Sequence, residues 1–318
     1  MNKLYRCASV FSAKNVLGYQ NGKYSKAIIS SKINGQILVG DYLLGDIIYE
    51  QIYVNRIIKR KNRISRLQAG KIQGLAANVD VAFIVTSANQ DFNMARLERY
   101  YVLAKESATR LCFILSKVDL TDKYEVLVNI IKERFPGSAI ERTSIYQSNT
   151  ETPLYQHWHE NETAIFLGSS GVGKSSLINL MLENEIIKTK NIRESDGRGR
   201  HTTTARHMYM LPNGRVVIDT PGLRSVGISA NANTIDELFP EISELECDCK
   251  YKNCSHLSEP GCAIRYALEK EELDYARYLR YLKLVGDENK RNTLLKGKAY
   301  EKEKIIKELK RPRNDKYR

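Results

Sequence analysis

A glycine-rich segment, GSSGVGKS at residues 168–175, has the composition and spacing of a loop that binds phosphate groups. The apolar run TAIFL precedes it and the amphipathic run KSSLINLML follows, so it lies between a predicted strand and a predicted helix. Glycines let the backbone curl until its N–H groups point at phosphate oxygens, and the helix start adds a positive dipole. We expect Lys174 to reach the β- and γ-phosphates of a nucleotide and the Ser175 hydroxyl to bind Mg²⁺. The predicted phosphate-loop contacts are Gly168, Ser169, Ser170, Gly171, Val172, Gly173, Lys174, Ser175 and Ser176.

A second phosphate-related motif, DTPG, ends the apolar run VVID. It fits D-x-x-G, in which Asp219 would hold a water bound to Mg²⁺ and the Gly222 N–H would meet the γ-phosphate. The segment before it, RESDGRGRHTTTARHMY, has almost no apolar anchors, so we expect it to be disordered without nucleotide. Either Thr203 or Thr204 could close over Mg²⁺ and the γ-phosphate, and the alternative is an unstructured basic loop.

The segment LSKVDL resembles a guanine-selecting loop, normally written N-K-x-D. The Asp119 carboxylate could accept two hydrogen bonds from guanine, whereas adenine offers no such pair. Ser116 stands where Asn is usual, and because its side chain is shorter we expect retained guanine selectivity with some loss of affinity. The Lys117 stem can lie over the base, and the later segment RTSIYQ could place an N–H near guanine O6. The predicted base-site residues are Ser116, Lys117, Val118, Asp119 and Ser144.

The order of these motifs is unusual, because the base-reading segment precedes the phosphate loop. A binding site is a spatial arrangement, and circular permutation is tolerated where the original termini lie close together. We therefore predict a circularly permuted domain, in which D-x-x-G falls at the end, directly before a cysteine cluster.

That cluster, CDCKYKNCSHLSEPGC, contains four of the six cysteines and one histidine. Any four of the five side chains could form a tetrahedral zinc site, of the Cys₃His type where the histidine takes part, and free thiols are the alternative. The loop has few apolar residues, so metal would supply its folding energy, and four protein ligands would leave no open position. We expect a structural site. The candidates are Cys247, Cys249, Cys254, His256 and Cys262.

Three regions must position these residues. Residues 1–68 carry short strand-like runs such as QILVG and DIIYEQIYV, typical of a small barrel or sandwich, and end in the basic stretch RIIKRKNRISR. Residues 69–228 alternate apolar strands with amphipathic helices, which predicts a mostly parallel sheet covered by helices. Residues 229–318 contain the cysteine cluster, helical patterns and a basic tail. The expected fold class is multidomain α/β.

The 318-residue chain carries a formal net charge of +13, which favours a polyanionic partner such as nucleic acid. The sequence contains no run of eighteen apolar residues, so no membrane span is predicted, and the N-terminus lacks the apolar core of a signal peptide. We expect a cytoplasmic protein whose tail at 298–318 is solvated when free and orders on a phosphate backbone.

Together, AANVD, SKVDL, GSSGVGKSS, GRGRHTTT, DTPGL, CKYKNCSHLSEPGC and RYLRYLKL resemble the motifs of the circularly permuted, small-ribosomal-subunit-dependent GTPases, the RsgA/YjeQ family. The resemblance implies an N-terminal OB-fold, a permuted P-loop GTPase domain and a C-terminal zinc-binding helical domain. It implies GTP hydrolysis that is stimulated by the small (30S) ribosomal subunit and its 16S rRNA during the late maturation of that subunit. The protein would act as a monomer and use GTP/GDP, Mg²⁺ and one Zn²⁺. Its C-x₄-C-x-H-x₅-C pattern implies the ligands Cys249, Cys254, His256 and Cys262, leaving Cys247 as a bystander or substitute.

The residue that follows D-x-x-G bears on catalysis. Many GTPases place a Gln after D-x-x-G to orient water, but here Leu223 cannot form a hydrogen bond with water. We expect slow intrinsic hydrolysis, with His201 as the candidate within the chain for orienting water, or else as a loop residue that touches rRNA. Two other functions fit the motifs: an assembly GTPase acting on the large subunit, and a non-catalytic RNA-binding protein whose shape GTP fixes.

Overall fold

The computed structural model describes residues 3–33, 35–48, 51–68, 71–107, 109–147, 149, 151–183, 206–220 and 232–296. Contacts within the chain divide it into two compact units. One unit combines Met1–Arg66 with Gln73–Val226, and the other combines Leu67–Ile72 with Gly227–Arg318. Among the described residues, none of the helices has the length and apolar character needed to cross a membrane.

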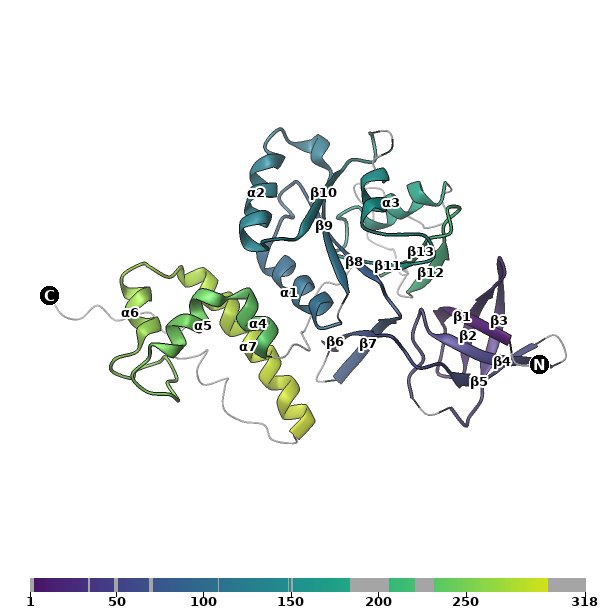
Figure 1. Ribbon diagram of the computed structural model, residues 1–318, viewed down its shortest axis with the longest axis horizontal. Coiled ribbons are helices and arrows are strands. Elements are labelled where there is room, and N and C mark those ends of the chain that lie inside the picture. Colours follow the sequence, from purple (N-terminus) through teal and green to yellow (C-terminus); the bar gives the residue numbers. More distant parts are fainter. Residues whose placement is uncertain are drawn as a thin grey trace, which may run out of the picture. The chain divides into compact units, whose positions relative to one another are not determined.

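The first five strands form the predicted barrel (Figure 1). They pair in the order β1-β2-β3-β5-β4, and β4 pairs back onto β1, which closes the ring in the order of an OB-fold. Successive strand residues face opposite sides, so alternate side chains such as Cys7, Leu43 and Val54 fill the interior. The barrel strands are β1 (Lys3–Val10), β2 (Asn15–Gln20), β3 (Lys23–Ile29), β4 (Tyr42–Ile48) and β5 (Gln51–Ile57).

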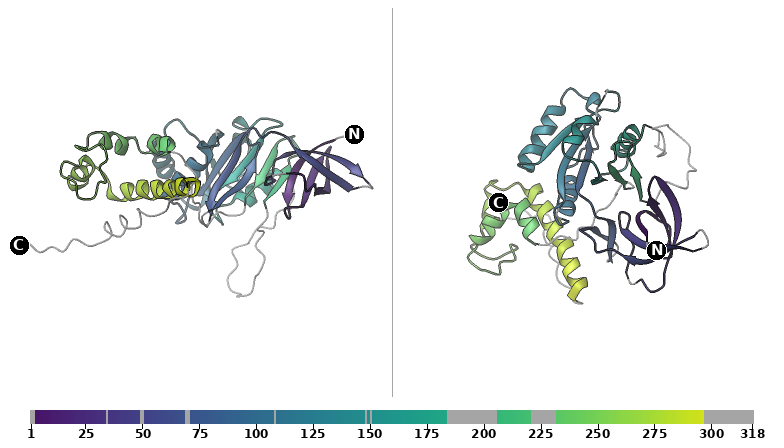
Figure 2. Two further views of the ribbon diagram at one scale, coloured as in Figure 1. Left: turned by 90° about the horizontal axis from the view of Figure 1, so that it is seen from below. Right: turned by 45° about the vertical axis from the view of Figure 1, so that its right-hand side comes forward.

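The rest of the first unit is the predicted parallel sheet with helices (Figure 2). Its strands lie in the order β10-β9-β8-β11-β13-β12, and only β12 is antiparallel to its neighbour. The central strands are apolar runs because both sheet faces are covered. A two-stranded hairpin, β6 (Arg63–Gln68) and β7 (Lys71–Ala77), leads into β8. The other elements are β8 (Val81–Ser87), α1 (Met94–Lys105), β9 (Arg110–Ser116), α2 (Tyr124–Arg134), β10 (Ala139–Thr143), β11 (Thr163–Leu167), α3 (Lys174–Met181), β12 (His207–Met210) and β13 (Val216–Asp219), with short 3₁₀ helices at Val118–Leu120 and Thr152–Gln156.

Aromatic side chains fill the layers on the two faces of this sheet. Beneath α3, Phe83 and Phe166 lie 5.0 Å apart between ring centroids and pack in one cluster with the buried Trp158. Elsewhere in the sheet, the ring centroid of Phe113 in β9 lies 4.6 Å from that of Phe135, the C-cap residue that follows α2. These layers fix the strands whose ends carry the predicted site.

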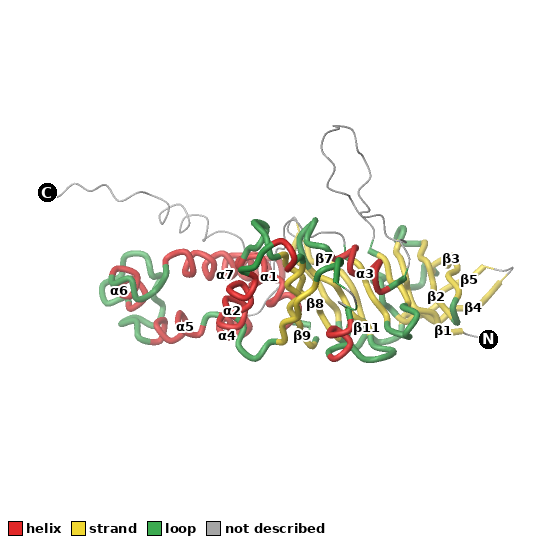
Figure 3. Tube along the Cα trace, turned by 90° about the horizontal axis from the view of Figure 1, so that it is seen from above, coloured by secondary structure: helices red, strands yellow, loops and turns green. Residues whose placement is uncertain are grey.

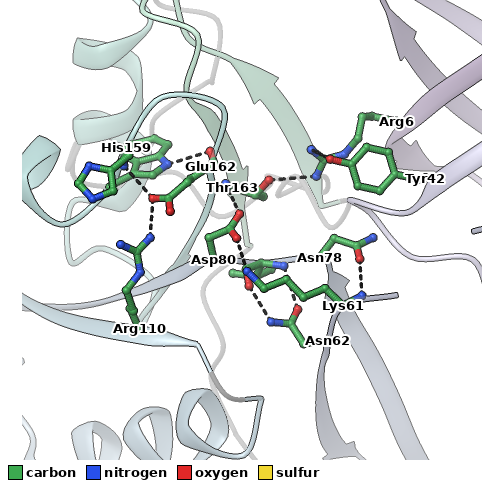
Figure 4. A network of polar contacts seen from close by, with 12 residues as sticks. Arg6, Tyr42, Lys61, Asn62, Asn78, Asp80, Arg110, His159, Glu162 and Thr163 are labelled. Carbon is green, nitrogen blue, oxygen red and sulfur yellow. Dashed lines mark hydrogen bonds and ion pairs between the residues drawn. The ribbon is translucent and has the colours of Figure 1, made fainter. Parts of the chain in front are cut away.

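Polar side chains join the barrel to the amino ends of β8 and β11 (Figure 4). The Asp80 carboxylate accepts hydrogen bonds from the Thr163 N–H at 2.8 Å and from Lys61 Nζ at 2.5 Å. Arg6 Nη2 donates to Thr163 Oγ1 over 3.0 Å. Lys61 belongs to the basic stretch, and its neighbour Arg60 is paired with a buried aspartate of the barrel. Two cations of the basic stretch, Arg60 and Lys61, thus have partners within the protein.

The second unit contains the predicted helices (Figure 3). Phe239, Ile242 and Ile264 are fully buried in it, and Tyr278 is nearly so. Arg277, in the last described helix, forms an ion pair with Glu241, in the second helix of this unit. The helices are α4 (Ala232–Leu238), α5 (Pro240–Cys247), α6 (Ala263–Glu269) and α7 (Tyr275–Lys296).

Candidate nucleotide site and metal site

The glycine-rich loop runs from the end of β11 to the start of α3, and its glycines have backbone angles that other residues rarely adopt. The φ angles are +158° at Gly168, +84° at Gly171 and +98° at Gly173. A Cβ on Gly168 would lie 2.5 Å from the Val85 carbonyl oxygen, so a side chain cannot be accommodated there. Glycine is therefore required both for the turn and for its close contact with β8.

Lys174 is buried beneath this loop with its ammonium directed at the loop backbone. Its Nζ donates to the carbonyl oxygens of Gly168 at 2.8 Å and Ser169 at 2.6 Å, and the residue is 5% exposed. Burial lowers the pKa of Lys174 to about 8, and the carboxylate of Asp219 partly offsets this. A polyphosphate bound beside Nζ would favour the charged ammonium. Of the other loop serines, Ser170 is exposed and Ser176 is half-buried in α3.

A serine and an aspartate meet beside the phosphate loop. Ser175 Oγ lies 3.3 Å from Asp219 Oδ2, at the end of β13, and the next residue, Thr220, is held by a 2.6 Å hydrogen bond to the Phe166 carbonyl. Asp219 Oδ1 is buried without a hydrogen-bond partner in the described part of the chain, and burial raises the pKa of this carboxyl. A hydroxyl and an unsatisfied buried carboxylate oxygen fit the oxygen ligands that Mg²⁺ prefers.

Ser116 connects the base-reading segment to the phosphate loop. Its Oγ lies 2.6 Å from the Val172 carbonyl oxygen and 3.0 Å from that of Thr86, and the residue is 6% exposed. A hydroxyl has one proton, so it donates to one carbonyl at a time, and Val172 is the closer. Because β9, β8 and β11 are parallel, their carboxyl ends meet at one edge of the sheet. Although the Ser116 side chain is shorter than that of the usual Asn, it makes a short hydrogen bond to the phosphate loop.

The remaining base-site residues lie at the same edge. Lys117 has φ +57°, an uncommon angle for a residue with a side chain, and the turn leaves Val118 buried and Asp119 exposed. β10 pairs with β9 at Thr143 and Ser116, which brings the following residue, Ser144, next to this turn. Ser144 is 1% exposed, and its Oγ accepts the N–H of Tyr146 over 3.2 Å.

Two residues that the motifs did not single out contact the phosphate loop. Arg96 and Tyr100, both on α1, form hydrogen bonds with the Ser169 side chain. They precede the loop by about seventy positions in the sequence, and no local pattern links them to it. Amphipathic spacing predicted the helix but not which of its residues would face the loop.

Five residues named in the sequence analysis lie outside the described residues. They are His201, Thr203, Thr204, Gly222 and Leu223.

Four of the five metal-ligand candidates come together between α5 and α6. The side-chain ligand atoms of Cys249, Cys254, His256 and Cys262 all lie within 4.8 Å of one another. Cys249 Sγ is 3.6 Å from His256 Nδ1, which is 3.4 Å from Cys262 Sγ. Tetrahedral zinc ligands at about 2.3 Å from the metal lie about 3.8 Å apart. The cluster could therefore hold a metal ion, and the distances between its ligand atoms fit tetrahedral coordination.

The fifth metal-ligand candidate, Cys247, differs from the other four in its position. Cys247, the last residue of α5, is exposed and is not part of the four-residue group. Glu246 Oε1 lies 3.5 Å from His256 Nε2, whereas the other ring nitrogen, Nδ1, lies beside the sulfur atoms of Cys249 and Cys262. A carboxylate on the second nitrogen of a metal-binding histidine commonly fixes the ring orientation.

Comparison with known proteins adds to this geometry. Residues 57–229, more than half of the chain, match the family model described as RsgA GTPase. A Vibrio vulnificus protein named Small ribosomal subunit biogenesis GTPase RsgA 2 is 37% identical over 278 residues, covering 85% of this chain and 78% of that protein. A Mesorhizobium japonicum protein named Small ribosomal subunit biogenesis GTPase RsgA is 40% identical over 278 residues, covering 81% and 77%.

Solved structures share the fold. YjeQ from Thermotoga maritima superposes with a TM-score of 0.59 at 23% identity, covering 91% of this chain and 99% of that one. YloQ, described as a circularly permuted GTPase, gives a TM-score of 0.58 at 24% identity, covering 95% and 98%. The predicted fold class is confirmed, and the extent of the sequence matches shows that the chain belongs to the RsgA GTPase family.

Proposed function

We propose that this GTPase binds the small (30S) ribosomal subunit, hydrolyses GTP faster when bound to it, and assists a late step of its maturation. The support is family membership together with the names of the relatives, which are small ribosomal subunit biogenesis GTPases. The net charge of +13 is consistent with 16S rRNA as the contacting surface. In this proposal the protein acts as a monomer in the cytoplasm, and residues 1–68, 69–228 and 229–318 are its barrel, GTPase and zinc-binding domains.

The observation that carries the enzymatic part is the grouping of Lys174, Ser175 and Asp219 at one edge of the sheet. Lys174 would bind the β- and γ-phosphates, while Ser175 and the water held by Asp219 would bind Mg²⁺, which offsets phosphate charge in GTP hydrolysis. Thr203 or Thr204 and the Gly222 N–H would complete the γ-phosphate contacts, and His201 would orient the attacking water.

Guanine recognition is assigned to the loops after β9 and β10. Asp119 is exposed and free to accept the two guanine N–H groups, Lys117 would cover the base, and a backbone N–H near Ser144 would meet guanine O6. Ser116 supports the site from below by its hydrogen bond to the phosphate loop.

The cysteine cluster is proposed to hold one structural Zn²⁺ through Cys249, Cys254, His256 and Cys262. All four coordination positions would be filled by protein, so no position would remain for a substrate. The role of the ion would be to fold a loop that contains few apolar residues.

Co-sedimentation with purified subunits tests the choice of partner. With a non-hydrolysable GTP analogue, the protein is expected to pellet with small subunits and to remain in the supernatant with large ones. Pelleting with large subunits alone would overturn the proposal in favour of a large-subunit assembly GTPase. Lys174→Ala is the matched control, because it removes the phosphate-binding ammonium and leaves the barrel unchanged.

A further inference from the structure

Helix α1 reaches the phosphate loop through two side chains one helical turn apart. Arg96 Nη1 donates to Ser169 Oγ over 3.1 Å. The same serine side chain acts on Tyr100: burial raises the pKa of the tyrosine hydroxyl, and hydrogen bonding with Ser169 partly offsets this rise. Residues four apart lie on one face of a helix, which is why both reach a single atom. Tyr100 is 2% exposed, so its ring is fixed by packing, while Arg96 lies at the surface.

Ser169 also orients the phosphate-binding lysine through its backbone. Its carbonyl oxygen lies 2.6 Å from Lys174 Nζ, and this is the shorter of the two hydrogen bonds that the ammonium makes to the loop. The side chain and the carbonyl belong to one residue, so restraining the hydroxyl limits the movement of the peptide group that holds the ammonium.

The helix that supplies these contacts is itself firmly held. Asn93 caps its first turn, with Oδ1 accepting the Arg96 N–H over 3.0 Å. Glu98, 1% exposed, forms a 2.7 Å ion pair with Arg134 of α2. Leu97, Val102 and Leu103 of the same helix are buried as well. A capped and packed helix gives the loop a support that three glycines at positive φ do not provide.

We propose that Arg96 and Tyr100 are positioning residues for nucleotide binding: they hold Ser169 so that its carbonyl keeps Lys174 directed at the phosphates. The inference rests on the proposed nucleotide site and adds to it a support from outside the motifs. Because Lys174 would contact the β-phosphate as well as the γ-phosphate, the support acts on GDP and GTP alike. Neither residue touches the nucleotide in this assignment.

Titration calorimetry with Mg²⁺ and GDP tests the proposal in the full-length protein. Arg96→Ala and Tyr100→Phe are each expected to raise the Kd by about three- to tenfold, the worth of one net hydrogen bond. Adding Arg96→Ala to Ser169→Ala should raise the Kd no further than Ser169→Ala alone. In a Ser169→Thr background, which keeps a hydroxyl, Arg96→Ala should weaken binding again. A merely structural role of Arg96 would not produce this dependence on the hydroxyl.

Lys105→Ala, at the last residue of the same helix, is the charge-matched control and should leave the Kd unchanged. The unfolding midpoint of each variant separates loss of the fold from loss of positioning, and Tyr100→Phe serves where Arg96→Ala is unstable. Unchanged Kd values in both variants, with binding abolished by Lys174→Ala, would overturn the positioning role and leave the nucleotide site standing. Unchanged binding in Lys174→Ala would instead remove the nucleotide site itself.

Discussion

At the scale of single residues, the hydroxyl of Ser116 connects the base-reading segment to the phosphate loop. Ser116 departs from the Asn of the usual motif, and its shorter side chain suggested some loss of nucleotide affinity. The structure shows a 2.6 Å hydrogen bond to the Val172 carbonyl, because parallel pairing brings the end of β9 close to the loop after β11. Residue type alone could not reveal that distance.

Ser116→Ala should therefore weaken nucleotide binding. Removal of the hydroxyl leaves the Val172 carbonyl without this donor, at a cost of about 1 kcal/mol, or roughly three- to tenfold in the Kd of both GDP and GTP. Selectivity for GTP over ATP should remain. Calorimetric titration measures this, with Ser25→Ala on the exposed face of the barrel as the control. An unchanged Kd would mean that the hydrogen bond contributes nothing to the site.

Asp119→Ala should have the complementary effect. Loss of the carboxylate removes the two acceptors for guanine N–H groups, so GTP affinity should fall while ATP affinity changes little. Competition of ATP and GTP for a fluorescent GDP analogue measures the ratio. If the preference for GTP over ATP persists in this variant, guanine is read elsewhere.

At the scale of elements, the hydrophobic pattern of the sequence predicted the strands and helices, but it could not predict which distant segments pair with each other. Apolar runs within residues 69–228 predicted buried strands. The contact of β1 with β12, in contrast, joins the Ser9 hydroxyl to the carbonyl oxygen of Arg206, 197 positions away. No local pattern encodes such a contact. For the same reason the motifs located Lys174 but missed Arg96 on α1.

The contact between β1 and β12 leads us to expect that the stability of the protein depends on pH. Burial lowers the pKa of His207, whose Nδ1 lies 3.0 Å from Ser9 Oγ, below its ordinary value of 6.5. The unfolded chain therefore takes up the proton first, and stability should be lost as pH falls from 6.5 toward the folded-state pKa. His207→Gln should lose less stability over this range in thermal unfolding. His159→Gln, at an exposed position, should behave like the parent protein.

The cysteine loop makes a metal prediction. Cys254→Ser should abolish tight zinc binding and lower the unfolding midpoint of the second unit, because the loop has few apolar residues to hold it. Cys247→Ser, which changes an exposed thiol outside the group, should retain one zinc per chain. Metal analysis of the purified variants measures both. Loss of zinc from the Cys247 variant would show that the ligand set is wrong.

At the scale of the whole molecule, the barrel and the nucleotide-binding sheet form one continuous eleven-stranded sheet. Arg6 of the barrel and Lys61 contact Thr163 and Asp80, which lie at the amino ends of β11 and β8. The carboxyl ends of these two strands meet the phosphate loop. The sequence predicted both parts and their order. It could not predict the polar contacts between them, since residues such as Lys61 read only as members of a basic stretch.

GTP hydrolysis by this protein is expected to depend on the small ribosomal subunit. Phosphate release under multiple-turnover conditions, with no subunits, small subunits or large subunits, tests it most directly. We predict slow release alone, strong stimulation by small subunits only, and no release from Lys174→Ala under any condition. Equal rates with and without small subunits, or stimulation by large subunits alone, would contradict the account.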